Sequence, residues 1–211
     1  ANHRHAHLMH FCQNNHLPIP IYDKKDNGKP FIKNIPNLHF NQSHCQTDYA
    51  LIYSLTIQNI GVDIENTNRH VNKNALAKRY FHDDEYYAWQ QSQDDKLWFV
   101  YWTIKEAVLK AHGLGIRLPL HELKAVFMTD DSGYVCHDKI GEFYFKNIWI
   151  GECVITVAYP FYYGAVGIVG FWFLKGVCCG DILYISNFKS YYKFLICGRR
   201  GVLSTPLQSL Q

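Results

Sequence analysis

A short strand with two acidic residues, followed by a long helix, is the feature of this sequence that most constrains its fold. Side chains alternate between the two faces along a strand, so within residues 61–65 Asp63 and Glu65 project to the same side. Residues 94–112 have the pattern of a long helix, and Gly113 is well placed to end it. A strand and a helix of this kind indicate a domain that combines both types of element.

The helix adds a third acid and a lysine to the two acids of the strand. Glu106 and Lys110 lie one turn apart on one helix face. Three carboxylates supply the hard oxygen ligands that Mg²⁺ prefers, and substrate phosphate oxygens and water commonly complete its shell. The set of Asp63, Glu65, Glu106 and Lys110 therefore suits a divalent cation that holds a phosphate ester. Two acids on one strand face are common, so the order of the surrounding motifs has to decide whether these residues form a metal site.

Composition limits the class of protein. The chain has 211 residues, of which 48% are hydrophobic, enough to bury a sizeable core. A formal net charge of +3 does not indicate nucleic-acid binding. Seven cysteines, an odd number at irregular spacing, argue against a disulfide framework and favour a reducing compartment. The first ten residues are polar and contain no signal peptide, so we expect a cytoplasmic protein.

The remaining patterns predict an α+β fold. We expect a helix over residues 1–16, a loop over 17–36, and an aromatic, β-branched strand over 49–57 that a turn at 58–59 joins in a hairpin to the strand at 61–65. Further helices are predicted at 75–81 and 84–91, and strands at 123–128, 142–149 and 152–159. Helices and strands alternate without the regular order of a parallel sheet.

The last fifty residues differ in character from the rest. Residues 161–174 form an apolar and aromatic run, shorter than the roughly twenty residues that a membrane-spanning helix needs. This segment is compatible with three interpretations: a tail that associates with a membrane, a tail that packs poorly, or a segment that is not native to this fold. We expect membrane association to be the less favoured of these and assign no function to residues 161–211.

Four ordered blocks resemble the signature of the Sfp-type 4′-phosphopantetheinyl transferases. They are Gly28-Lys29-Pro30, Phe40-Asn41-Gln42-Ser43-His44, Gly61-Val62-Asp63-Ile64-Glu65 and Trp102-Thr103-Ile104-Lys105-Glu106-Ala107. Three further stretches agree with that family: His3-Arg4, residues 77–81 followed by Glu85, and residues 113–120. The resemblance covers about residues 1–160.

The resemblance implies a reaction and a fold. The family transfers 4′-phosphopantetheine from coenzyme A to a serine of an acyl or peptidyl carrier protein, releases adenosine 3′,5′-bisphosphate, and requires magnesium. Its fold is a pseudo-twofold pair of similar α+β halves, with coenzyme A held between them. A chain that holds both halves is expected to act as a monomer.

The same resemblance implies roles for individual residues. Asp63, Glu65 and Glu106 resemble the metal ligands, and Glu106 is also the expected general base, acting directly or through a metal-bound water. Lys110 is expected to meet the pyrophosphate and stabilise charge as the bond breaks. The residues that resemble contacts to coenzyme A, besides Lys110, are Arg4, Lys29, Ser43 and His44. Lys105 is expected to lie behind the site, and Glu85 to have a structural role.

The resemblance also has departures. Arg4 lies almost at the first residue, so we expect an incomplete N-terminal half (1–58) before a C-terminal half (59–160), with 161–211 as a tail of unknown role. Two alternatives to the transferase follow: a relative that binds coenzyme A or carrier protein without catalysis, and an unrelated metal-dependent phosphohydrolase that uses Asp63, Glu65 and Glu106.

Overall fold

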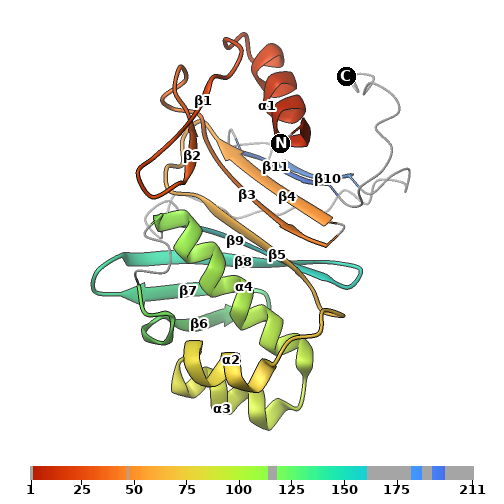
Figure 1. Ribbon diagram of the computed structural model, residues 1–211, viewed down its shortest axis with the longest axis vertical. Coiled ribbons are helices and arrows are strands. Elements are labelled where there is room, and N and C mark those ends of the chain that lie inside the picture. Colours follow the sequence, from red (N-terminus) through yellow and green to blue (C-terminus); the bar gives the residue numbers. More distant parts are fainter. Residues whose placement is uncertain (1, 47, 114–117, 161–181, 187–191, 198–211) are drawn as a thin grey trace.

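The computed structural model describes residues 2–46, 48–113, 118–160, 182–186 and 192–197 (Figure 1). Antiparallel strands form a four-stranded sheet in the order β10-β11-β4-β3, a five-stranded sheet in the order β5-β9-β8-β7-β6, and a small β1-β2 ribbon. Four α-helices accompany these sheets in the described residues. The predicted α+β fold class is confirmed.

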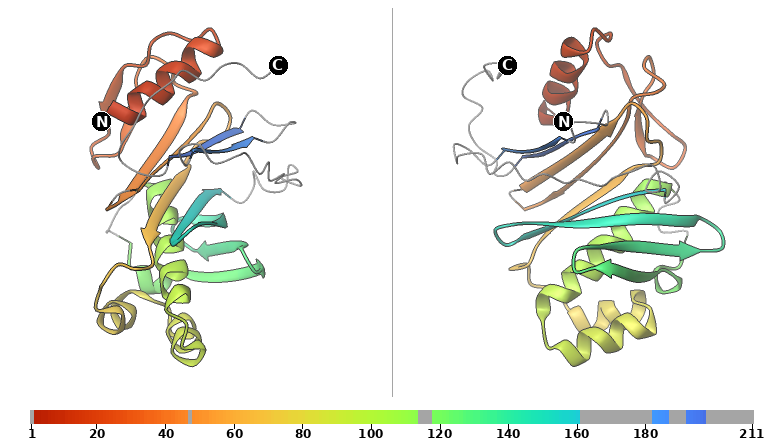
Figure 2. Two further views of the ribbon diagram at one scale, coloured as in Figure 1. Left: turned by 90° about the vertical axis from the view of Figure 1, so that its right-hand side faces the viewer. Right: turned by 180° about the vertical axis from the view of Figure 1, so that it is seen from behind.

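The N-terminal part packs one helix on the four-stranded sheet. Its elements are α1 (Asn2–Asn14), β1 (Tyr22–Lys24), β2 (Pro30–Ile32), β3 (His39–Cys45) and β4 (Asp48–Ser54). Leu8 and Phe11 of α1 are buried against Leu51 and Tyr53 of β4, and this cluster forms a core of its own. Figure 2 shows α1 lying over the outer side of β3 and β4.

The C-terminal part wraps a long helix against the five-stranded sheet. Its elements are β5 (Gly61–Asn66), α2 (Lys73–Tyr80), α3 (Asp83–Ser92), α4 (Asp95–His112), the 3₁₀ turn η2 (Leu120–Glu122), β6 (Lys124–Thr129), β7 (Ser132–His137), β8 (Gly141–Ile150) and β9 (Cys153–Pro160). Helix α4 packs on β5, β9 and β8. Its buried Ile104 and Val108 belong to the largest apolar cluster of the described residues.

Helix α4 begins and ends where its sequence predicts. The Asp94 side chain accepts a hydrogen bond from the Lys96 N–H and caps the first turn. Gly113 takes a left-handed conformation with φ of 88° and donates its N–H to the Leu109 carbonyl at 2.7 Å. The predictions of helices at 1–16, 75–81 and 84–91 agree with α1, α2 and α3 to within a few residues.

Strands β3 and β5 lie side by side where the two sheets meet. The Asn41 side-chain oxygen of β3 accepts the Val62 N–H of β5 at 3.1 Å, so a side chain joins these two strands. Residues of β3 can therefore reach the acids of β5.

The hairpin predicted from the turn at residues 58–59 is wrong. Strand β4 pairs with β3 and β11, whereas β5 pairs with β9, in the other sheet. The Ser54 hydroxyl accepts the N–H groups of Thr56 and Ile57, and Asn59 has a positive φ of 52°, so the chain leaves one sheet and enters the other between these residues. A turn signal identifies a change of direction, and it does not identify the partner strand.

Besides β3 and the two strands of the tail, β10 and β11, three short strands were not predicted. Strands β1 and β2 form within the segment expected to be a loop, and β7 lies between the strands predicted at 123–128 and 142–149. Each is six residues long or shorter, and β2 begins with a proline. Short strands of this kind carry little alternation, so their pattern is weak.

Part of the predicted tail pairs with the N-terminal sheet. Strand β11 (Tyr192–Cys197) pairs antiparallel with β4, and β10 (Ile182–Ser186) pairs with β11. The apolar run at 161–174 lies outside the described residues. Across the ranges that the structure describes, no helix is both long and apolar enough to cross a membrane.

One glycine allows β5 and α4 to approach closely. A Cβ placed on Gly61 would lie 2.0 Å from the Ala107 carbonyl oxygen and 2.5 Å from the Ala111 nitrogen, well inside van der Waals contact. Because only glycine fits there, the backbone of the strand can lie directly against the helix. The contact brings the acids of β5 next to those of α4.

Candidate active site between β3, β5 and α4

The two acids of β5 are buried. Asp63 is 4% exposed and Glu65 is 8% exposed, because β3 covers the edge of the strand on which they lie. Burial of a carboxylate costs free energy unless other groups compensate its charge. Their surroundings therefore decide what they can do.

Asp63 is held by two groups and keeps one free oxygen. Its Oδ1 accepts a hydrogen bond from the Ser43 hydroxyl at 2.8 Å and forms an ion pair with the Lys110 ammonium at 2.5 Å. The same ammonium donates to the Ser43 hydroxyl at 2.9 Å. Its Oδ2 is buried without a hydrogen-bond partner. Burial raises the pKa of Asp63, and the charge of Lys110 opposes that rise.

Glu65 repeats this arrangement with a different cation. Its Oε1 forms an ion pair with Arg69 at 2.5 Å, and its Oε2 is buried without a partner. Burial is the main cause that raises the pKa of Glu65, and the negative charge of Asp63 adds to it. The sequence patterns did not single out Arg69, although its spacing of four residues from Glu65 was visible.

Glu106 of α4 faces the same two acids. Burial raises the pKa of its carboxyl group, the charge of Asp63 raises it further, Lys110 lowers it, and Glu65 has a smaller raising effect. Carboxylates that raise each other's pKa repel one another, and a cation between them removes that cost. The structure thus brings Asp63, Glu65, Glu106 and Lys110 to one place, as their order in the sequence predicts.

The donor set fits a hard divalent cation. Two buried carboxylate oxygens have no partner, and all three side chains offer the oxygen ligands that Mg²⁺ prefers. Within the described residues, the donor oxygens of the three acids do not all lie within 4.8 Å of one another. The roles of these residues as metal ligands stay predictions.

Ser43 and His44 are adjacent on β3 and have different surroundings. Ser43 is buried against Asp63 and Lys110, whereas His44 is exposed. Successive residues of a strand point to opposite faces, which explains the difference. Their contacts with coenzyme A stay predictions.

Lys29 lies at the end of α4. Its ammonium donates to the carbonyl oxygens of Lys110 and Ala111 at 2.6 and 2.9 Å, where the negative end of the helix dipole favours a cation. Burial, together with the charge of Lys25, lowers the pKa of Lys29 to about 8. This lysine therefore connects the loop before β2 to the helix that carries Glu106.

A basic pocket of about 240 Å³ opens beside Lys29. Lys25, Lys33 and His39 also line it. Burial lowers the pKa of His39, and the charges of Lys25 and Lys29 lower it further. Concentrated positive charge of this kind suits a phosphate group. The sequence patterns missed Lys25, Lys33 and His39, although the run of lysines over residues 24–33 was a possible signal.

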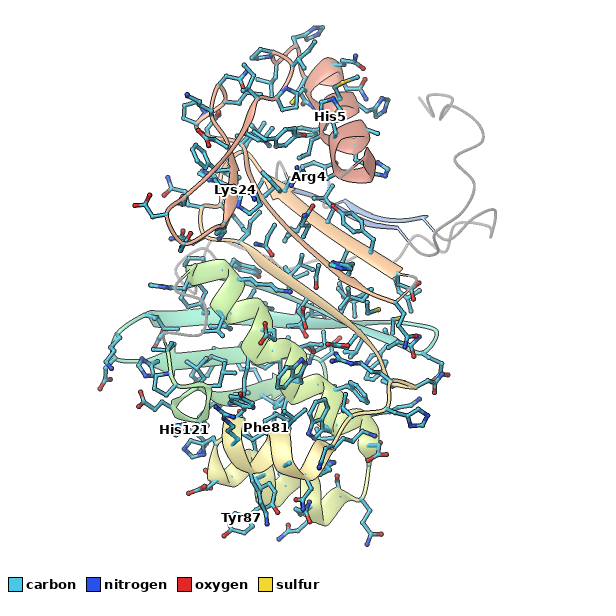
Figure 3. The ribbon with its side chains drawn as sticks, viewed as in Figure 1. Arg4, His5, Lys24, Phe81, Tyr87 and His121 are labelled. Carbon is cyan, nitrogen blue, oxygen red and sulfur yellow. The ribbon has the colours of Figure 1, made fainter. Side chains whose placement is uncertain are left out.

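Arg4 lies at the first turn of α1 (Figure 3). Its guanidinium carbon lies 4.5 Å from the ring centroid of Tyr22 and 5.4 Å from that of Phe40, and its Nε is buried without a partner. Phe40 also lines the basic pocket, so Arg4 lies behind its wall.

Lys105 and Glu85 form a second acid–base pair on the other side of α4. Lys105 is 1% exposed and its ammonium lies 2.6 Å from Glu85 Oε2, while it also donates to the carbonyls of Leu120 and Leu123. The Glu85 carboxylate accepts the N–H groups of His82 and Ala125. Every oxygen of Glu85 is used, which supports the structural role expected for it.

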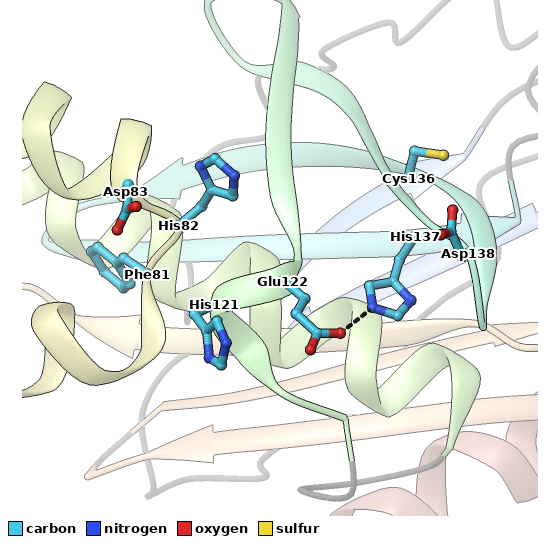
Figure 4. A pocket seen from close by; sticks show the side chains of 8 residues that line it. All are labelled: Phe81, His82, Asp83, His121, Glu122, Cys136, His137 and Asp138. Carbon is cyan, nitrogen blue, oxygen red and sulfur yellow. Dashed lines mark hydrogen bonds and ion pairs between the residues drawn. The ribbon is translucent and has the colours of Figure 1, made fainter.

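A larger hollow of about 490 Å³ shares no residue with this site (Figure 4). Three histidines line it, His82, His121 and His137, and Nε2 of His137 lies 2.8 Å from Glu122 Oε2. His137, the last residue of β7, is thus already paired with a carboxylate.

Known proteins resemble about half of this chain. Residues 59–158 match the model of the 4′-phosphopantetheinyl transferase superfamily. The chain is 34% identical over 105 residues to the 4′-phosphopantetheinyl transferase gsp of Aneurinibacillus migulanus, which covers 48% of this chain and 41% of that protein. It is 33% identical over 102 residues to the 4′-phosphopantetheinyl transferase Sfp of Bacillus subtilis (strain 168), covering 47% and 44%. The chain thus spans less than half the length of these two relatives.

A solved structure shows a weaker likeness. The holo-[acyl-carrier-protein] synthase of Thermotoga maritima aligns with 66% of this chain and 83% of that chain, at 14% identity and a TM-score of 0.41.

The matched region contains β5, α4 and all three acids of the site. This part of the chain is similar to the 4′-phosphopantetheinyl transferase superfamily. The similarity to these two relatives confirms the resemblance to Sfp-type proteins found in the sequence.

Proposed function

We propose that this protein transfers 4′-phosphopantetheine from coenzyme A to a serine of an acyl or peptidyl carrier protein. The observation that carries the proposal is the group of Asp63, Glu65 and Glu106 around Lys110, with two buried carboxylate oxygens that lack a partner. The group lies inside the region that matches the superfamily.

Asp63, Glu65 and Glu106 would hold Mg²⁺. When bound, the ion supplies positive charge that neutralises the pyrophosphate of coenzyme A. The residues of the chain then have separate tasks. Lys110 is fixed by Asp63 and Ser43, so its ammonium is oriented before a substrate arrives.

Glu106 is the proposed general base. It takes the proton from the serine hydroxyl of the carrier protein, and the serine oxygen forms a bond to the phosphorus that carries pantetheine. The bond from that phosphorus to the bridging oxygen breaks, and adenosine 3′,5′-bisphosphate leaves with the electron pair. A carboxylate with a raised pKa is a better proton acceptor than an ordinary one at the same pH, because it holds the proton more tightly.

The basic pocket would bind the 3′-phosphate of coenzyme A. Lys25, Lys29 and Lys33 supply the positive charge, and Lys29 contacts the same turn of α4 that carries Lys110. This position supports one ligand that reaches both the pocket and the acids. The predicted contacts of Arg4 and His44 with coenzyme A belong to the same proposal.

An apo-carrier protein, coenzyme A and Mg²⁺ form the test mixture. The carrier protein is expected to gain the mass of phosphopantetheine in an intact mass spectrum, and a chelator should abolish the gain. Binding of coenzyme A without mass gain would favour the non-catalytic relative. Release of phosphate from coenzyme A without carrier protein would favour a hydrolase.

A further inference from the structure

Three strand ends meet at a second group of metal-binding side chains. Cys45 ends β3, Asp48 begins β4, and Cys153 begins β9. One sulfur or carboxylate oxygen from each residue lies within 4.8 Å of the other two. Among the residues that the structure describes, this is the one group of three His, Cys, Asp or Glu side chains that meets this distance.

Both cysteines are buried and already contact each other and the acid. Cys45 is 8% exposed and Cys153 is 6% exposed, whereas Asp48 is half-buried. The Cys153 thiol donates to Asp48 Oδ2 with a sulfur–oxygen distance of 3.4 Å.

The spacing and the ligand types suit zinc. Zinc–sulfur bonds are about 2.3 Å and zinc–oxygen bonds about 2.0–2.2 Å, so ligands of a tetrahedral ion lie roughly 3.3–3.8 Å apart. Three ligand atoms within 4.8 Å therefore need to move by about 1 Å or less. Two thiolates select a softer ion than the carboxylates of the active site, which suit Mg²⁺.

We propose that Cys45, Asp48 and Cys153 bind one zinc ion, with a water molecule as the fourth ligand on the exposed side of Asp48. Binding would replace the two thiol protons, which go to the buffer, by two zinc–sulfur bonds. No electron is transferred. The ion would connect the β3–β4 turn of the four-stranded sheet to β9 of the five-stranded sheet.

The position gives this ion a structural task. Cys153 pairs with Asn66, and the next pair along β5 and β9 is Glu65 with Val154. A zinc ion at the strand ends would thus fix the contact between the sheets one residue beyond the acids of the active site. The proposal does not depend on the transferase function.

Cobalt provides the direct test, because Co²⁺ bound to thiolate has an ultraviolet absorption band from sulfur-to-metal charge transfer. We expect the reduced full chain to show this band on addition of Co²⁺, and Zn²⁺ to displace it at one equivalent. Carboxylate-bound Co²⁺ lacks the band, so the active-site acids do not contribute. Native mass spectrometry of the unmodified protein should show one retained zinc ion.

Matched variants separate this site from the other cysteines. Cys45→Ser and Cys153→Ser should each remove most of the band and the rise in melting temperature that Zn²⁺ causes. Cys12→Ser, a buried cysteine in α1, and Cys136→Ser, an exposed one, should keep both. Asp48→Asn should weaken Zn²⁺ binding by at least the roughly 10-fold that loss of an outer partner causes.

Three outcomes would overturn the proposal. One is a wild-type protein with no Co²⁺ band and no retained zinc. Another is a band that survives in both Cys45→Ser and Cys153→Ser. The third is a Cys45–Cys153 disulfide in protein purified without reductant, which peptide mass mapping would find. It would have to form again after reduction even when equimolar Zn²⁺ is present.

Discussion

Two acid–lysine groups lie on opposite sides of helix α4, and they differ in how many of their polar atoms have a hydrogen-bond partner. Behind the helix, Lys105 and Glu85 form a buried pair in which both carboxylate oxygens and the ammonium have partners. In front of it, Asp63 and Glu65 each keep one buried oxygen without a partner. Both groups are buried and charged.

The difference separates a structural pair from a candidate site. A buried charge whose partners are all inside the protein has nothing left to offer a ligand. Unpartnered buried oxygens cost free energy in the empty protein, and a bound cation recovers that cost. Burial alone therefore does not distinguish the two groups, whereas the unused carboxylate oxygens mark the front group as the candidate site.

The largest expected effect tests the front group. Glu106→Gln should lower the transfer rate by about 10³-fold or more, because it removes a predicted metal ligand and the proposed base at nearly constant volume. The melting temperature should stay within a few degrees of the wild type, since the change also removes a repulsive charge. Intact mass spectrometry of the carrier protein gives the rate, and near-normal turnover would exclude Glu106 as base.

The matched change behind the helix should do the opposite. Glu85→Gln leaves the Lys105 ammonium buried without its counter-charge, so we expect a loss of about 3–5 kcal/mol in the free energy of unfolding. Urea unfolding followed by circular dichroism measures it. Below the unfolding transition the folded fraction should bind adenosine 3′,5′-bisphosphate as the wild type does. Unchanged stability would mean that the pair contributes nothing to the fold.

A third prediction concerns Mg²⁺ without any substrate. Binding to the folded state alone should stabilise it by about 2.7 kcal/mol when free Mg²⁺ is 100 times its Kd. Differential scanning calorimetry should therefore show a melting temperature that rises with Mg²⁺ in the wild type and in Glu85→Gln, and hardly at all in Glu106→Gln. Equal shifts in both variants would place the ion elsewhere.

The smallest effect concerns the basic pocket. Lys29 has a pKa lowered to about 8, so it is charged below that pH and loses its proton as pH rises through it. If its ammonium meets a phosphate, affinity for adenosine 3′,5′-bisphosphate should fall about tenfold between pH 7 and pH 9. Lys29→Arg, which stays charged over this range, should show a smaller fall by isothermal titration calorimetry. Identical pH profiles would exclude Lys29 from phosphate binding.

The sequence predicted the elements whose signals are local. Helix α4 has an aspartate cap, a long apolar face and Gly113 at its end, and each lies within one turn of the feature it determines. The alternation of β5 gave the shared face of Asp63 and Glu65 for the same reason. The alternation of a strand does not show which helix residue lies near it, and the resemblance to a known family linked β5 to Glu106.

Features that depend on distant partners could not be predicted in this way. The partner of β4 is β3 on one side and β11 on the other, and nothing near residues 58–59 specifies either. The basic pocket joins loop lysines to His39 and Asn59, and the ion pair of Asp63 with Lys110 joins residues 47 positions apart. Such contacts depend on how the two sheets pack, which a single sequence does not display.

The bare backbone of Gly61 has a consequence for which metal the site would accept. Since 2.0 Å separates the position of a first side-chain carbon from the Ala107 carbonyl, even a methyl group would push the strand away from the helix. The ligands would remain, and the gap between them would widen. Gly61 would therefore determine the preference for a small ion without touching the ion. A substitution there would change ion-size selectivity although every coordinating group stays the same.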